Sequence, residues 1–340
     1  MSKKEYGQFY TTRYRYILQN LSIPDDVEHI IEPFCGEGDL LQFINSDERY
    51  TIECYDIEPK KDSIIQRDTL SNPPDYNNKF ILTNPPYLAR NKSETKEIYD
   101  RYNANDLYKC FIKELLTNRC KGGIIIIPLN FWSSIRNADI ELRKQFLYVY
   151  NVIYLNVFEE QVFDDTSYTV CSFQFELNVG VNSSIPSMIY PHKKNMNVLL
   201  NDENQYTFGG EIYNLPLKNE YKITRLTSKN ASNKNTNILV KCIDDNESNQ
   251  INLSVVPDDK VYIDDTPKLS ARTYASLIIT PAISLEKQKV LVAEFNIYLT
   301  EKRKNYNSLF LTNYRESKSS ARKRISFELV YNIVQYILER

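Results

Sequence analysis

A run of four isoleucines, closed by glycines on one side and proline on the other, constrains the fold of this chain most. It spans residues 122–128 and has the sequence GGIIIIP. A strand that is apolar at every position is typical of a parallel sheet buried on both faces by helices. The run therefore predicts a central strand and an α/β fold.

Apolar runs and helix-like segments alternate on both sides of this strand, from about residue 27 to 178. Period and composition predict strands at 27–34, 51–57, 63–68, 79–83, 152–158 and 168–177. Helical spacing predicts helices at 39–44, 103–120 and 135–150. We therefore expect a Rossmann-like α/β fold with a mixed, seven-stranded sheet, whose last two strands form an antiparallel pair at one edge.

The texture of the sequence changes after about residue 178, where Ser, Asn, Asp and Pro interrupt short apolar runs. We expect two domains, 1–178 and 179–340, the second rich in loops and short strands. Its last segment, 326–340, predicts a helix, whereas the pattern at 295–304 is ambiguous.

The composition of the chain bears on metal binding, disulfides, membrane insertion and nucleic-acid binding. The six cysteines are scattered without a C-x-x-C pair and there are two histidines, so we expect reduced thiols and no metal site. No apolar stretch reaches the ~20 residues that span a bilayer, and the N-terminus has no apolar signal region. We expect a cytoplasmic protein without a membrane partner. The net charge of -2 neither indicates nor excludes binding to nucleic acid.

The strand at 79–83 ends in Asn84-Pro85-Pro86-Tyr87. Proline cannot donate to a sheet ladder, and the residue before a proline is held extended. The result is a stiff turn that points the Asn84 side chain in a fixed direction. We interpret it as a positioning device.

A second turn, Glu32-Pro33-Phe34-Cys35-Gly36-Glu37-Gly38, follows the first strand. Its two carboxylates would repel a pyrophosphate, whereas S-adenosylmethionine carries a sulfonium and an ammonium and fits better. Asp56 ends the next strand, where an acid can accept from both ribose hydroxyls, and Asp68 ends the third, where it could accept from the adenine amino group. The alternative is that such acids only cap helices.

Together these residues resemble the γ-class amino-group DNA methyltransferases, which modify adenine N6 and occur in type II restriction–modification systems. The turn at 32–38 is similar to the family's D-P-x-x-G-x-G, with Glu32 for Asp, and N-P-P-Y matches at 84–87. Further similarities are Gly7–Thr12 to G-x-F-Y-T-P with Thr12 in place of the proline, Asp106-Leu107-Tyr108 to D-L-Y, 122–128 to the family's G-G-x-x-x-x-x-P strand, and, loosely, Val162-Phe163 to an aromatic segment that contacts the target base.

The resemblance implies an S-adenosylmethionine-dependent enzyme that flips an adenine out of double-stranded DNA. The Asn84 side-chain carbonyl and the Pro85 backbone carbonyl would accept the two N–H groups of the adenine amine, with Tyr87 and Phe163 stacking on the base. The cofactor contacts that it implies are Tyr10, Thr11, Glu32, Phe34, Gly36, Gly38, Asp56, Ile57, Asp68, Thr69 and Asn84.

The C-terminal domain would recognise the DNA target. A basic cluster there could contact phosphates or could simply be a solvated face: Lys318, Arg322, Lys323 and Arg324. A cognate restriction endonuclease acting on the same site is a partner that the resemblance allows, in a bacterial or virus-infected cell. The alternatives are an N4-cytosine DNA methyltransferase, an RNA or protein-glutamine methyltransferase with the same turn, and a DNA-binding module without activity.

Overall fold

The structure is a computed structural model that describes residues 7, 9, 11–44, 49–163, 168–178, 184–246, 249–265, 273–311, 313–317 and 320–340, with the backbone alone over 313–317 and 320–322. The chain divides into two compact units. The first comprises Met1–Leu199 with Glu316–Ser320, and the second comprises Leu200–Arg315 with Ala321–Arg340. The main division between these two units follows Leu199.

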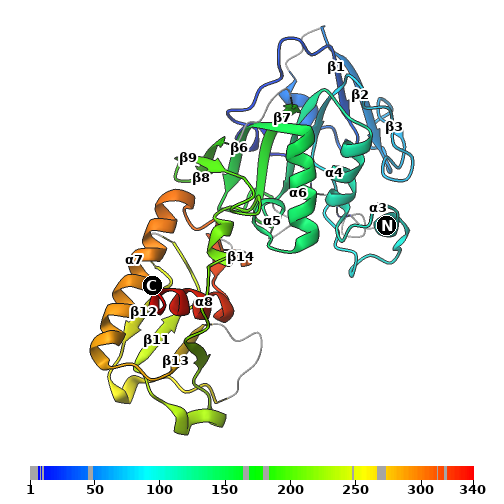
Figure 1. Ribbon diagram of the computed structural model, residues 1–340. Coiled ribbons are helices and arrows are strands. Elements are labelled where there is room, and N and C mark those ends of the chain that lie inside the picture. Colours follow the sequence, from blue (N-terminus) through cyan, green and yellow to red (C-terminus); the bar gives the residue numbers. More distant parts are fainter. Residues whose placement is uncertain are drawn as a thin grey trace. The chain divides into compact units, whose positions relative to one another are not determined.

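The first unit is built on a nine-stranded mixed sheet with the order β3-β2-β1-β4-β5-β7-β6-β8-β9 (Figure 1). The strands are β1 His29–Glu32, β2 Thr51–Asp56, β3 Ile65–Gln66, β4 Phe80–Thr83, β5 Gly122–Pro128, β6 Tyr150–Phe158, β7 Val170–Leu177, β8 Ser184–Tyr190 and β9 Lys194–Leu199. Strands β1 to β5 pair in parallel, and β7 runs antiparallel between β5 and β6. The expected α/β class and the mixed sheet are confirmed.

The helices of this unit are α2 Tyr14–Ile17, α3 Glu97–Tyr102, α4 Leu107–Thr117, α5 Asn130–Ser133 and α6 Asn137–Val149. Helices α4 and α6 lie side by side over one face of the sheet (Figure 1). Every residue of β5 is buried, as its apolar sequence predicts. The predicted helix at 39–44 is instead a 3₁₀ turn over Leu40–Phe43, because so short a run closes too few i→i+4 bonds to nucleate an α-helix.

The sheet is wider than expected. Beyond the seven predicted strands, β8 pairs in parallel with β6, and β9 pairs antiparallel with β8. The pair β6–β7 is antiparallel, as predicted, but it lies inside the sheet rather than at its edge. Pro186 within β8 removes one ladder donor, and this weakens the strand signal in the sequence.

The second unit has a four-stranded antiparallel sheet with the order β10-β13-β11-β12. Its elements are β10 Lys222–Arg225, β11 Ile238–Lys241, β12 Asn252–Val255, β13 Tyr274–Thr280, α7 Leu285–Tyr306 and α8 Phe327–Leu338. Strands β14 Asn313–Ser317 and β15 Ser320–Arg324 pair with each other, and the division between the two units crosses both of them. Helix α7 packs along β12 and α8 packs on β10. The helix predicted at 326–340 is confirmed, and the ambiguous segment 295–304 lies within α7.

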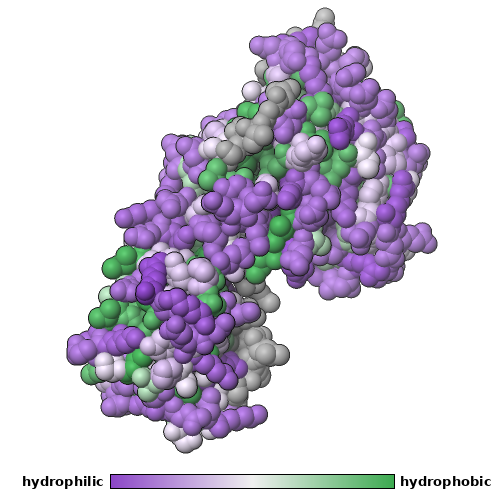
Figure 2. All heavy atoms as spheres, viewed as in Figure 1, coloured by the Kyte–Doolittle hydropathy of each residue, from purple (hydrophilic) through white to green (hydrophobic). Residues whose placement is uncertain are grey.

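Apolar side chains from both helices and the sheet form the core of this unit. Figure 2 shows hydrophilic residues over most of the visible surface of each unit. None of the helices in the described part of the chain has the length and apolar character that crossing a membrane requires.

Gly122 and Gly123, at the start of β5, allow its neighbours β4 and β7 to approach closely in the centre of the large sheet. A Cβ on Gly123 would lie 2.6 Å from the Ile81 carbonyl oxygen and 2.8 Å from the Ile81 Cβ, and one on Gly122 would lie 2.6 Å from the Phe175 carbonyl oxygen. Because backbone cannot yield as a flexible side chain does, only glycine fits here.

We expect Gly123→Ala to lower the free energy of unfolding by about 1–3 kcal/mol, since the added methyl group overpacks the sheet. Urea unfolding followed by circular dichroism measures the change. Tyr148→Ala, at a residue that is 81% exposed, is the control and should change stability by less than about 0.5 kcal/mol. Equal stability of Gly123→Ala and wild type would contradict the strand spacing described above.

Candidate functional site

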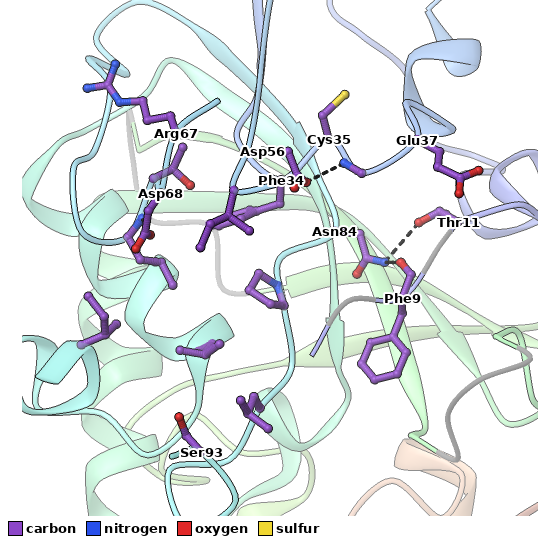
Figure 3. A pocket seen from close by; sticks show the side chains of 18 of the residues that line it. Phe9, Thr11, Phe34, Cys35, Glu37, Asp56, Arg67, Asp68, Asn84 and Ser93 are labelled. Carbon is purple, nitrogen blue, oxygen red and sulfur yellow. Dashed lines mark hydrogen bonds between the residues drawn. The ribbon is translucent and has the colours of Figure 1, made fainter. Parts of the chain in front are cut away.

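The carboxyl ends of β1, β2, β3 and β4 meet at one edge of the large sheet because these strands are parallel. A cavity of about 750 Å³ opens there. It is lined by Phe9, Thr11, Phe34, Cys35, Gly36, Glu37, Asp39, Leu40, Asp56, Ile57, Arg67, Asp68, Thr69, Leu70, Asn84, Pro86, Leu88, Lys92, Ser93, Glu94, Thr95, Ile98, Tyr99 and Leu107 (Figure 3).

Backbone hydrogen bonds fix the turn after β1 against the end of β2. The Cys35 N–H donates to the Tyr55 carbonyl at 2.8 Å, and the Gly36 N–H donates to Asp56 Oδ2 at 2.8 Å. Gly36 and Gly38 have φ of 56° and 79°, a left-handed conformation that glycine adopts without a Cβ clash. The backbone of the turn, without a side chain at Gly36, therefore lines the cavity beside the Asp56 carboxylate.

Asp68 begins the loop after β3. Its Oδ1 accepts from the Leu70 and Ser71 N–H groups, both at 3.1 Å, so it caps its own loop as well as lining the cavity. The neighbouring Thr69 hydroxyl donates to the Pro33 carbonyl at 3.0 Å and ties this loop to the first turn. The capping role and the cavity-lining position therefore coexist at Asp68.

Glu32 lies beneath the cavity and is only 1% exposed. Its Oε1 accepts from the Thr83 hydroxyl at 2.5 Å and from the Phe34 N–H at 3.3 Å, and its Oε2 is buried without a hydrogen-bond partner. Burial raises the pKa of Glu32 well above its ordinary value, against the Thr83 hydrogen bond that lowers it. The residue braces β1 against β4 from below rather than lining the cavity.

An acidic wall faces the cavity at Glu37 and Asp39. Burial and the nearby Glu37 carboxylate raise the pKa of Asp39, while Lys61 lowers it. A cationic group bound beside these two residues would reduce their mutual repulsion. The wall therefore favours a positively charged ligand.

Asn84 lies at the end of β4, where the Pro-Pro turn begins. Its Nδ2 donates to the Phe9 carbonyl at 2.9 Å and to Thr11 Oγ1 at 3.1 Å, as Figure 3 shows. Asn84 lines the cavity together with Asp56 and Asp68. An amide and two acids from three different strand ends are thus brought to one cavity.

Three rings pack behind Asn84. Tyr87 and Phe163 are 2% and 3% exposed, and Phe9 contacts both, with ring centroids at 5.3 Å from Tyr87 and 6.2 Å from Phe163. Phe9 lines the cavity itself. The Phe9 ring thus packs against both rings that the sequence suggests for stacking on a base.

The cavity brings together most of the residues predicted from the sequence: Thr11, Phe34, Gly36, Asp56, Ile57, Asp68, Thr69 and Asn84. Tyr10 lies outside the described residues. The predicted residues that do not line the cavity are Glu32, Gly38, Pro85, Tyr87 and Phe163.

Three residues of the predicted basic cluster, Arg322, Lys323 and Arg324, lie in β15. Lys318 lies outside the described residues, and the side chain of Arg322 is not described. Lys323 is only 2% exposed, whereas Arg324 is half-buried with its Nε buried and without a hydrogen-bond partner.

Several lining residues escaped the sequence-based prediction. The loop that holds Lys92, Ser93, Glu94 and Thr95 closes one side of the cavity, although its polar sequence resembles an ordinary linker. Arg67 directly precedes Asp68, and Phe9 lies in the motif at Gly7–Thr12. Their place in the sequence beside predicted residues could therefore have indicated both. Nothing local marks the loop at 92–95, because its place depends on the fold.

We expect Glu32→Gln to gain stability relative to wild type as the pH rises from 5 to 8. A buried carboxyl whose pKa is raised binds more protons in the folded state, so wild-type stability falls as the pH rises from the unfolded pKa toward the folded pKa. The glutamine cannot ionise and escapes this loss. Thermal unfolding at each pH measures the difference.

The matched control is Glu97→Gln, at an exposed carboxylate on α3, and it should follow the wild-type profile. A Glu32→Gln profile parallel to that of wild type would contradict the described environment of this residue.

No protein-family model matches the sequence, and no curated protein matches it. Among solved structures, a modification subunit of a putative type I restriction enzyme from Vibrio vulnificus YJ016 is similar, with TM-score 0.40 and 16% identity over 55% of this chain and 48% of that one. A type I restriction–modification methyltransferase subunit from Streptococcus thermophilus gives TM-score 0.43 and 17% identity over 61% and 53%. A putative class I S-adenosylmethionine-dependent methyltransferase from Listeria monocytogenes gives 0.38 and 12% over 52% and 61%.

The chain spans about half the length of the first two of these structures. The similarity to methyltransferases of restriction–modification systems is distant and concerns the fold alone.

Proposed function

We propose that this protein is an S-adenosylmethionine-dependent DNA methyltransferase that modifies the N6 amino group of an adenine flipped out of double-stranded DNA. The observation that carries the proposal is that a single cavity is lined by Asp56, Asp68 and Asn84. The two carboxylates can accept hydrogen bonds from a nucleoside, and the Asn84 amide can accept one from an amine. Both kinds of group therefore line the same cavity.

The size of the cavity, its hydrogen-bond acceptors and its negative charges fit S-adenosylmethionine. Its volume, about 750 Å³, is in the range of small-molecule sites, roughly 300–1,000 Å³. Asp56 would accept from the ribose hydroxyls and Asp68 from the adenine amino group, while Glu37 and Asp39 offer negative charge to an ammonium. When bound, this cofactor supplies a methyl group on a cationic sulfur that departs as a neutral thioether.

The work of Asn84 is to orient the target amine. The lone pair of an exocyclic adenine nitrogen is delocalised into the ring, so the amine is a poor nucleophile. Hydrogen bonds from its two N–H groups to the Asn84 side-chain carbonyl and the Pro85 carbonyl would direct the lone pair toward the cavity. They also stabilise the positive charge that grows on this nitrogen, which afterwards releases one proton to water.

Tyr87 and Phe163 are proposed to stack on the extruded base. Both rings are buried and both contact Phe9, so the Phe9 ring has to move aside before a base reaches them. The replacement of one aromatic contact by another offsets part of the cost of unstacking the base.

The second unit, Leu200–Arg315 with Ala321–Arg340, is proposed to recognise the target sequence. Arg322 and Arg324 of β15 are candidates for phosphate contacts, whereas Lys323 is too deeply buried to meet a phosphate without rearrangement. Contacts of this kind would position the DNA and make binding depend on salt.

Purified protein, cofactor with a labelled methyl group, and separate duplex DNA, RNA and protein substrates test the proposal. We expect label in duplex DNA, recovered on digestion as N6-methyladenine. Label in cytosine N4, in RNA or in protein glutamine would assign the chain to a different methyltransferase class, and no label in any substrate would refute an enzymatic function. Modification-sensitive sequencing of DNA from an expressing host would then give the recognition sequence.

We expect Asn84→Ala to lower the transfer rate by about 10²-fold or more, because a donor–acceptor contact made in the transition state is lost. Cofactor affinity, measured by calorimetry, should change little, since Asp56 and Asp68 remain. Asn77→Ala, at an exposed asparagine that precedes β4, is the control with wild-type activity. An undiminished rate in Asn84→Ala would contradict the positioning mechanism.

A further inference from the structure

The hydrogen bonds of Asn84 decide which end of its amide faces the cavity. A carbonyl oxygen can only accept, so the amide nitrogen has to face the Phe9 carbonyl at 2.9 Å. The second hydrogen of this nitrogen is directed to Thr11 Oγ1 at 3.1 Å. With both hydrogens bound, the amide cannot rotate without breaking two contacts.

The oxygen end of the amide is held as well. The Tyr87 hydroxyl contacts Asn84 Oδ1 and also lies 2.8 Å from the Ile126 carbonyl. Burial raises the pKa of Tyr87 well above its ordinary value, so the phenol keeps the proton that it donates. A carbonyl oxygen has two lone pairs, and Oδ1 can therefore accept from a substrate N–H beside this hydroxyl.

Two hydrogen bonds join the turn at Asn84 to the N-terminal residues, and in both of them the turn donates to a backbone carbonyl. The Tyr87 N–H donates to the Gly7 carbonyl at 2.9 Å, while the Phe9 carbonyl accepts from Asn84. Gly7 has φ of +67°, and a Cβ on it would lie 2.7 Å from the Tyr87 carbonyl oxygen, so only glycine permits this approach.

We infer that Thr11 is a positioning residue that, together with the Phe9 carbonyl, turns the Asn84 carbonyl toward the target amine. The inference rests on the proposed function and deepens it. An amide turned the other way would present N–H groups to the N–H groups of the amine, and no hydrogen bond could form. Thr11 thus acts on the rate of transfer through Asn84, beyond any contact it makes with the cofactor.

The full chain carrying Thr11→Val tests this role, because valine keeps the shape of threonine and removes its acceptor oxygen. We expect kcat to fall about tenfold, which corresponds to about 1.4 kcal/mol, with the calorimetric Kd for S-adenosylmethionine within about twofold of wild type. Thr11→Ser returns the hydroxyl and should recover most of the loss. Thr12→Val, the same change at the exposed next residue, is the matched control and should leave kcat unchanged.

Two results would overturn the inference: an unchanged kcat in Thr11→Val, whether or not the Kd is raised, or no recovery of kcat in Thr11→Ser. A wild-type protein that transfers no methyl group refutes the proposed function instead. The orientation is then tested by thermal unfolding of Thr11→Val, Asn84→Ala and the double variant. Losses of stability in the double variant that fall short of the sum of the two single losses support the contact, and additive losses refute it.

Discussion

Parallel pairing of β1, β2, β3 and β4 is the constraint on which the rest of the site depends. Each of these strands is followed by a polar residue or turn, and parallel pairing alone brings all of these ends to one edge. The spacing of β4 and β5 depends in turn on Gly123, whose missing side chain admits the Ile81 carbonyl. A shift in this part of the sheet would move Asn84 relative to Asp56.

The charge at this edge is arranged in two layers. Glu32 lies below the cavity, bonded to Thr83, and Glu37 and Asp39 lie in its wall. Burial opposes ionisation of both Glu32 and Asp39, and repulsion by the Glu37 carboxylate adds to this effect at Asp39. A cation bound beside Glu37 and Asp39 would relieve the repulsion between them, which is the electrostatic reason for proposing a sulfonium cofactor rather than a dinucleotide.

Local signals were enough to predict the centre of the fold and much of the site. The isoleucine run predicts β5, the two prolines predict the end of β4, and Asp56 ends a strand, β2, whose apolar residues predict it clearly. Long-range contacts were not predictable in this way. Pro186 disguises β8, charged residues interleave with the apolar positions of α7, and the loop at 92–95 lines the cavity only because the fold carries it there. The contact of Phe9 with Tyr87 likewise joins residues far apart in the sequence.

The proposed mechanism requires one cavity to hold S-adenosylmethionine with its methyl group facing Asn84. A crystal structure of the protein soaked with this cofactor tests it most directly. We expect the ribose hydroxyls to lie about 2.5–3.0 Å from the Asp56 carboxylate and the methyl group to face the Asn84 carbonyl. A cofactor bound elsewhere, or bound with its methyl group turned away from Asn84, would contradict it.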